Sequence, residues 1–211
     1  MKYCSAIITL PLYTALLLFC SCNKTDSYET VLPVITEMVR AETDSSGDFR
    51  AITTDNKKRY LVSAGERARL SPDTVYRVIC NYLVEDSVTA SIISTFNILS
   101  GFAIPNSLLT GPVKKDPIKL ISIWISGGYL NIAFQVMTFN KTHIITAIDY
   151  TERTKVKLGI YHDNQGDENV FTKEGYMSVP LSTYDFLKSG DSITFVFNSY
   201  SGQEERIIAF K

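Results

Sequence analysis

The stretch Trp124–Phe139, WISGGYLNIAFQVMTF, decides the fold. Two apolar runs, Ile118–Ser126 and Tyr129–Phe139, meet at Gly127-Gly128. Adjacent glycines between β-rich runs are typical of a hairpin turn, because both can adopt positive φ without a Cβ clash. In the second run apolar residues alternate with small or polar ones, which is the period of a strand with one buried face. The sequence therefore predicts a hairpin within a β-rich domain.

The N-terminal segment has the features of a secretory signal peptide. Lys2 is followed by the apolar run Ala6–Phe19, which is shorter than the roughly 20 residues that span a bilayer. A charged start, a short apolar core and then small residues are typical of a signal that is removed from the mature protein. We therefore expect residues 1–22 to be a lipoprotein signal peptide that precedes the folded domains.

Residues 19–22, Phe-Cys-Ser-Cys, resemble a bacterial lipobox. Ser21 supplies the small residue before an acylated cysteine, so Cys22 fits the motif, whereas Cys20 follows the bulky Phe19. Phe19 stands where Leu is usual, and a plain signal peptide is the alternative. Several acyl chains, palmitate among them, hold a protein firmly on a membrane, since one chain alone binds weakly. We expect lipidation of Cys22 and a place in the cell envelope, at the outer membrane, with its face left open.

The net charge and the cysteine count limit what the chain is expected to bind and which covalent links it is expected to form. The formal net charge of −1 provides no basic surface field for nucleic acid. Of the four cysteines only Cys22 and Cys80 remain after cleavage, and Cys22 is expected to be acylated, so we expect no disulfide within the chain. Cys80 lies in the apolar run VYRVICNYLV and is interpreted as a small buried hydrophobic residue. We expect no cofactor and no metal.

Two β domains are predicted after a polar tether at residues 23–30. Residues 31–112 contain about five β-rich segments between turn formers, which suits a small barrel of the OB type. Residues 116–211 contain about seven more, spaced like the strands of a sandwich. Ser182–Lys188 alone has helical features. The predicted fold class is all-β: a small OB-like barrel followed by a roughly seven-stranded antiparallel β-sandwich.

The lipobox, the small N-terminal β domain and the segment Ile123–Ile132, IWISGGYLNI, resemble the NigD-like lipoproteins of Gram-negative anaerobes. Gly175–Leu181, GYMSVPL, is similar to a later strand of that family. The resemblance implies an OB-like domain followed by a β-sandwich domain. The family is named for its place in a bacteriocin operon, which suggests a part in bacteriocin production or self-protection. It brings no catalytic residues to this chain.

The candidate metal ligands have simpler interpretations. His143 opens a predicted strand and His162 closes one, so both are interpreted as surface histidines. His162–Glu168, HDNQGDE, groups oxygen ligands around a glycine, but its spacing is not that of an EF-hand calcium loop. We interpret this segment as a solvated hairpin loop.

Three Asp-Ser/Thr-apolar triplets place Thr74, Ser87 and Ser192 in the pattern of the O-glycosylation acceptor used by such anaerobes. The same triplets are typical of a turn that enters a strand. Both interpretations stay open at this point.

The sequence contains no recognisable catalytic set, and we expect a protein that is not an enzyme. No Ser lies in the G-x-S-x-G setting of a hydrolase nucleophile, and no pair of carboxylates stands out. We expect a lipid-anchored envelope protein with a binding or accessory role, whose partners are the membrane and a protein or glycan. The alternatives are a bacteriocin-associated or self-protection protein and a glycan- or ligand-binding module. For the latter, the aromatic residues to examine are Trp124, Tyr129, Tyr161 and Tyr176, although core packing is their simpler role.

Overall fold

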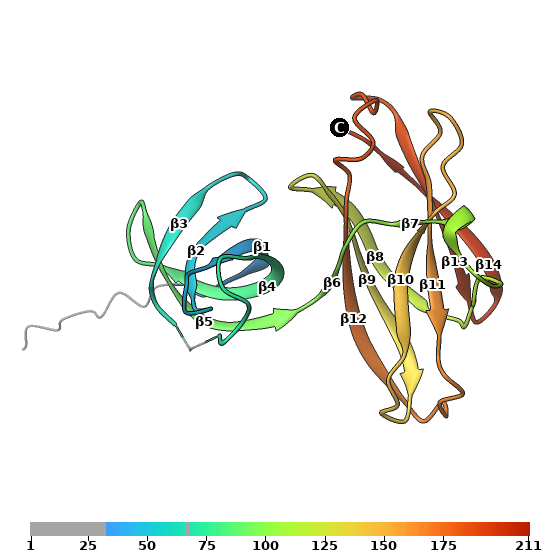
Figure 1. Ribbon diagram of the computed structural model, residues 1–211, viewed down its shortest axis with the longest axis horizontal. Coiled ribbons are helices and arrows are strands. Elements are labelled where there is room, and N and C mark those ends of the chain that lie inside the picture. The colour runs from blue at the N-terminus through green and yellow to red at the C-terminus, as the bar shows by residue number, and fades with distance from the viewer. Residues whose placement is uncertain (1–32, 66–67) are drawn as a thin grey trace, which may run out of the picture. The chain divides into compact units, whose positions relative to one another are not determined.

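The computed structural model describes residues 33–65 and 68–211 (Figure 1). The predicted signal peptide, the lipidation site Cys22 and the tether at residues 23–30 lie outside these ranges. Within the ranges, strands make up nearly all the regular structure, with one 3₁₀ turn at Asn106–Leu108. No helix there has the length and apolar character that crossing a membrane requires. The predicted all-β fold class is confirmed.

The first five strands close into a barrel. They are β1 (Ile35–Thr43), β2 (Phe49–Thr54), β3 (Arg59–Ala64), β4 (Val75–Val84) and β5 (Thr89–Asn97). Their order is β1-β2-β3-β5-β4, with β4 returning to pair with β1 and β3 running parallel to β5. A closed five-stranded barrel with a crossed-over strand order is typical of OB folds, so the predicted OB-like barrel is confirmed.

Alternate residues of these strands turn inward and form the barrel core: Val39, Ala41, Ile52, Tyr60, Val78, Cys80, Tyr82, Ala90 and Ile92. Burial raises the pKa of the Cys80 thiol to about 12, with a smaller contribution from the Glu37 carboxylate. The thiol therefore stays protonated near neutral pH, and Cys80 acts as a packing residue, as the sequence indicates.

The remaining strands form the two facing sheets of a sandwich (Figure 1). One sheet has the order β6-β12-β9-β8 and consists of β6 (Leu99–Ser100), β8 (Lys119–Ser126), β9 (Tyr129–Thr138) and β12 (Phe171–Pro180). The other has the order β14-β13-β11-β10-β7 and consists of β7 (Ile104–Pro105), β10 (Ile144–Asp149), β11 (Lys157–Asp163), β13 (Ser192–Ser199) and β14 (Gly202–Ala209). Buried residues of both sheets, such as Ile132, Phe134, Leu158 and Phe195, form one shared core. The predicted barrel-plus-sandwich arrangement is confirmed.

The structure differs from the sequence-based prediction in three details. First, β6 and β7 fall within residues 31–112, which the sequence-based division assigns to the barrel, yet they pair with β12 and β10 of the sandwich. Second, the sheets are not wholly antiparallel. Between β11 and β13 the chain forms β12, which belongs to the opposite sheet. The chain therefore reverses direction twice, and β11 and β13 run parallel to each other.

Third, Ser182–Lys188 forms consecutive turns and no α-helix. The Tyr184 side chain is buried, and its hydroxyl donates to Asp149 Oδ2 at 2.9 Å. Fixing this side chain against β10 favours two separate turns, which the Tyr184 N–H and the Leu187 N–H close at 3.0 Å each.

The predicted hairpin is present, with β8 and β9 paired antiparallel up to Ser126 and Tyr129. Gly127 and Gly128 have φ values of 60° and 84°, as a type I′ turn requires. A Cβ atom on Gly127 would collide with the carboxylate of Asp55, in the loop between β2 and β3. The turn therefore packs closely against the barrel, and glycine is required there for space as well as for backbone conformation.

Beside this turn, a buried arginine connects the barrel to the sandwich. The Arg77 side chain on β4 is 2% exposed, and its guanidinium pairs with Asp55 at 2.5 Å (Nη1–Oδ1) and 2.9 Å (Nη2–Oδ2). Nη1 also donates to the Met38 carbonyl at 3.3 Å. On the sandwich side, Nη2 donates to Asn131 Oδ1 at 3.3 Å and Nε donates to Ser178 Oγ at 3.5 Å.

Two residues of the hairpin complete this arrangement. The Tyr129 ring centroid lies 4.5 Å from Arg77 Cζ, which is within cation–π range. The Ser126 hydroxyl donates to Asp55 Oδ2 at 2.5 Å. We refer to the following six residues as the Arg77 joint: Asp55, Arg77, Ser126, Tyr129, Asn131 and Ser178. Because buried charges and amides are costly without partners, the joint holds the two domains in mutual contact.

We expect R77A to lower the free energy of unfolding by about 3–5 kcal/mol, because it leaves the largely buried Asp55 carboxylate without its cationic partner and removes one of the two donors to Asn131 Oδ1. Urea denaturation of the mature chain measures this loss. R59A is the matched control: Arg59 pairs with Glu42 at 2.8 Å with its side chain 47% exposed, so its loss should stay below about 1 kcal/mol. Equal losses in the two variants would contradict the role assigned to the joint.

Candidate ligand-binding cavity

A cavity opens where two strands of the five-stranded sheet separate. β11 and β13 pair in parallel over a short stretch and then diverge. Residues 114–118 lie between the diverging strands: the His162 N–H donates to the Lys114 carbonyl at 3.1 Å, and the Ile118 N–H donates to the Asn198 carbonyl at 2.8 Å. This inserted segment holds the two strands apart while satisfying their backbone hydrogen bonds.

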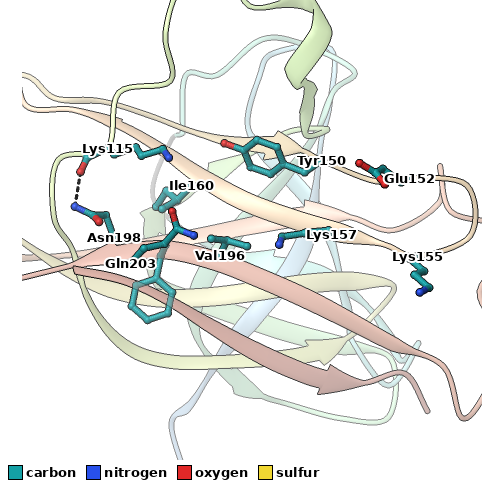
Figure 2. Close-up of a pocket in the computed structure, with 10 residues that line it drawn as sticks. Lys115, Tyr150, Glu152, Lys155, Lys157, Ile160, Val196, Asn198 and Gln203 are labelled. Atoms are coloured by element: carbon teal, nitrogen blue, oxygen red, sulfur yellow. Dashed lines mark hydrogen bonds between the residues drawn. The ribbon is translucent and has the colours of Figure 1, made fainter. Parts of the chain in front are cut away.

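The cavity has a volume of about 470 Å³, within the range of small-molecule sites (Figure 2). Its floor is apolar: Ile160 and Phe197 belong to the sandwich core, and Val196 is half-buried beside them. Asn198 and Gln203, which are register partners on β13 and β14, add two amide side chains. The Asn198 amide donates to the Lys115 carbonyl at 2.8 Å, which ties β13 to the inserted segment.

Three lysines give the rim of the cavity a positive charge. Lys115 comes from the inserted segment, while Lys155 and Lys157 come from the approach to β11 and its first residue (Figure 2). Lys157 Nζ lies 2.8 Å from Glu205 Oε1, whereas Lys115 and Lys155 form no ion pair with any described residue. Glu152 is the acidic side chain in the lining. The cavity is therefore locally basic in a chain whose formal net charge is −1.

Tyr150 forms one wall of the cavity. Its ring covers Gly159 of β11, where a Cβ atom would lie 2.8 Å from Tyr150 Cε2, closer than side chains pack. Burial raises the pKa of the Tyr150 hydroxyl, against the opposing effect of Lys157. The phenol therefore stays neutral near physiological pH and can donate a hydrogen bond. An apolar floor, an aromatic wall and ammonium groups at the rim together suit non-covalent binding.

The aromatic residues suggested by the sequence do not gather at this cavity. Trp124, Tyr129 and Tyr176 lie on the outer face of the four-stranded sheet, and Tyr161 lies on β11; all four are half-buried. Trp124 stands opposite Asn131 in the register, and its Nε1 donates to Ser126 Oγ at 3.1 Å. Tyr129 thus belongs to the Arg77 joint and Trp124 lies beside it, so the role of both is structural.

The cavity residues were not predicted from the sequence. Lys155 and Lys157 are two positions apart, a spacing that places side chains on the same face of a strand. This spacing is the signal that could have indicated a basic face. Lys115 and Gln203 join it only through the inserted segment and β14, which sequence spacing does not indicate.

The three glycosylation triplets all lie at turns that enter strands. Thr74 precedes β4, Ser87 precedes β5 and Ser192 begins β13. Ser87 and Ser192 are exposed, whereas Thr74 is half-buried and donates to the Pro72 carbonyl at 2.8 Å. These positions agree with the turn interpretation, and modification of the three hydroxyls stays a prediction.

The expectation of two surface histidines is wrong. His162 is 2% exposed, and the His143 side chain is 6% exposed. His143 Nδ1 lies 2.8 Å from His162 Nε2, and His143 Nε2 lies 3.1 Å from Asp167 Oδ2. At the other end of this row of hydrogen bonds, His162 Nδ1 lies 3.0 Å from the Asp116 carbonyl. The segment 114–118 and the loop after β11 cover the two rings, which sequence spacing alone could not indicate.

Asp167 belongs to the loop interpreted as solvated, but its side chain turns inward. Burial alone would raise its pKa, yet hydrogen bonds from the Thr138 hydroxyl, the Phe139 N–H and His143 outweigh burial and lower that pKa. Asp167 is therefore a carboxylate that anchors the histidine pair. In the described part of the chain, no group of three or more His, Cys, Asp or Glu side chains is placed to hold a metal ion.

The hydrogen-bond partners of His143 and His162 determine which ring nitrogens carry a proton. The Asp116 carbonyl can only accept, so His162 Nδ1 carries a proton, and the Asp167 carboxylate requires one on His143 Nε2. His143 Nδ1 and His162 Nε2, which face each other at 2.8 Å, cannot both carry a proton, because two N–H groups would then oppose each other.

We expect the free energy of unfolding to fall as pH is lowered from about 6.5 to 5.5. Burial lowers the pKa of His162, against the opposing hydrogen bond with Asp116, while the unfolded chain titrates near the ordinary value of 6.5. Below that pH the unfolded state binds more protons than the folded state, so acid destabilises the fold. Protonation of Asp167 lowers the free energy of unfolding only at pH values below its ordinary pKa of 3.8, which lie outside this interval.

Urea unfolding at several pH values measures the slope, and H162Q should flatten it. An unchanged slope in H162Q would show that the acid sensitivity arises elsewhere.

The family model described as the NigD-like C-terminal beta sandwich domain matches residues 104–210, about half of the chain. No curated protein matches the chain.

Several solved structures share the fold. The chain is 28% identical to a NigD-like immunity protein from Bacteroides caccae ATCC 43185, with a TM-score of 0.68 over 82% of this chain and 92% of that one. It is 17% identical to a candidate toxin-related protein from Parabacteroides distasonis ATCC 8503, with a TM-score of 0.70 over 85% and 94%. It is 16% identical to a candidate lipoprotein from Bacteroides fragilis NCTC 9343, with a TM-score of 0.60 over 85% and 98%. The last two similarities show the fold alone.

Proposed function

The chain belongs to the NigD-like family, and on this premise we propose that it is a lipid-anchored protein of the cell envelope that binds a ligand or partner without catalysing a reaction. The observation that carries the binding role is the preformed basic cavity between β11 and β13. Two of its floor residues, Ile160 and Phe197, belong to the sandwich core, so its shape needs no rearrangement before a ligand enters.

The anchor is supported by the sequence and by one relative in fold. Ser21-Cys22 fits a lipobox at the end of an apolar signal. The neighbour from B. fragilis carries a name that marks it as a candidate lipoprotein. We place this chain at the outer membrane, held by acyl chains on Cys22, with a protein or glycan of the envelope as its partner.

We expect C22A to release the protein from the membrane fraction and to abolish its labelling by palmitate, because the acylated sulfur is lost. Fractionation of cells grown with labelled palmitate measures both effects. C20A is the matched control: Phe19 precedes Cys20, so this variant should stay labelled and membrane-bound. Retention of labelled C22A in the membrane would exclude the proposed anchor.

A second candidate function is self-protection against a bacteriocin. It is favoured by the similarity to the protein from B. caccae, which is named a NigD-like immunity protein. In this case the partner of the anchored sandwich would be a toxin or the toxin's target.

We expect deletion of the protein to make cells sensitive to the cognate bacteriocin, and expression of the wild-type chain to restore resistance. Growth inhibition in the presence of the toxin measures the effect. C22A expressed to the same level is the control, because an anchored protector should lose activity with its anchor. A deletion strain as resistant as its parent removes this candidate.

A further inference from the structure

The charges around the cavity are the first indication of what it binds. Lys115 and Lys155 approach from different elements, and neither ammonium group has a described ion-pair partner. Lys157 is balanced by Glu205, and Glu152 balances one more charge at most. The rim therefore retains net positive charge, which attracts an anion and repels a cation.

The floor supplies the second requirement. Ile160, Val196 and Phe197 present apolar surface at the base of the cavity, and Ile160 and Phe197 are 6% and 3% exposed. Such a floor favours a ligand with an apolar body over a fully hydrated inorganic ion. The Tyr150 ring provides a wall on which a planar group can stack.

The amides restrict the ligand further. Asn198 uses one amide hydrogen to hold the Lys115 carbonyl, so its position is fixed, and Gln203 lies beside it on β14. Both can hydrogen-bond to a polar group between the apolar body and the charge. A volume of about 470 Å³ accommodates a small molecule or the end of a chain.

We propose that the cavity between β11 and β13 binds an organic anion: its acidic group is attracted by the rim lysines, Lys115 at one end of the cavity and Lys155 at the other (Figure 2), and is joined to an apolar body that rests on Ile160, Val196 and Phe197. The inference rests on the proposed binding function and names its ligand class. A free organic acid and the carboxyl terminus of a polypeptide share this chemistry.

The probe is 1-anilinonaphthalene-8-sulfonate, an aromatic anion whose fluorescence rises in apolar surroundings. N-phenyl-1-naphthylamine, which has the same rings without the sulfonate, is the neutral control. Titration of the mature wild-type chain should show saturable binding of the sulfonate at one site, and weaker binding of the neutral dye.

The double variant K115Q/K155Q should bind the sulfonate about tenfold more weakly, since two charge interactions are lost. K173Q/K188Q makes the same change in net charge at exposed lysines that do not line the cavity, and should bind like the wild type. V196F fills the floor and should weaken binding of both dyes. Circular dichroism checks that each variant is folded.

Phenylacetate and a short peptide ending in phenylalanine distinguish the two sources of the anion. Displacement of the dye by phenylacetate favours a free acid, and displacement by the peptide alone favours a polypeptide terminus. Phenylacetamide, which is neutral, should not compete. Equal affinity for the charged and neutral dyes, or equal affinity of the two double variants, would overturn the proposal. Such a result would leave the anchoring and partner tests standing, so the two failures can be told apart.

Discussion

The contact between the barrel and the sandwich depends on the hydrogen bonds and the ion pair of the buried Arg77 guanidinium. Its charge is almost fully removed from water, and its contacts come from both domains: Asp55 on the barrel side, and Asn131 and Ser178 on the sandwich side. A charge buried in this way is tolerated only while its partners stay in place. The hairpin supplies three of the six residues of the joint, because Ser126, Tyr129 and Asn131 all lie within or beside its turn. The segment that decides the fold of the sandwich therefore also connects the two domains.

This use of the hairpin determines where a ligand can bind on the sandwich. Near the joint, the outer face of the four-stranded sheet is covered by barrel residues, and Asn131 and Ser178 are fully buried there. The five-stranded sheet is different, because residues 114–118 spread β11 and β13 and leave a preformed cavity. The same segment covers His162, whose ring is tied to the Asp116 carbonyl. The inserted segment 114–118 thus forms a wall of the cavity and also fixes the buried, hydrogen-bonded side chains of His162, His143 and Asp167.

The sequence predicted what depends on local pattern. Alternation and the Gly127-Gly128 turn indicated the hairpin, turn formers marked the barrel strands, and the apolar surroundings of Cys80 indicated a packing residue. It could not predict what depends on contacts between distant segments. Nothing near Arg77 in the sequence points to Asn131 or Ser178, and the spacing of His143 and His162 does not show that they meet. The cavity was missed for the same reason, since Lys115 joins Lys157 only through the inserted segment.

The central claim is that the Arg77 joint makes the barrel and the sandwich a single cooperative unit. Native-state hydrogen exchange at increasing urea tests it most directly, with the amides of β1 and β4 reporting on the barrel and those of β9 and β12 on the sandwich. The account predicts that the most protected amides of both domains open with the same free energy and the same dependence on urea. Barrel amides that exchange through a separate opening of lower free energy, while the sandwich stays protected, would contradict it.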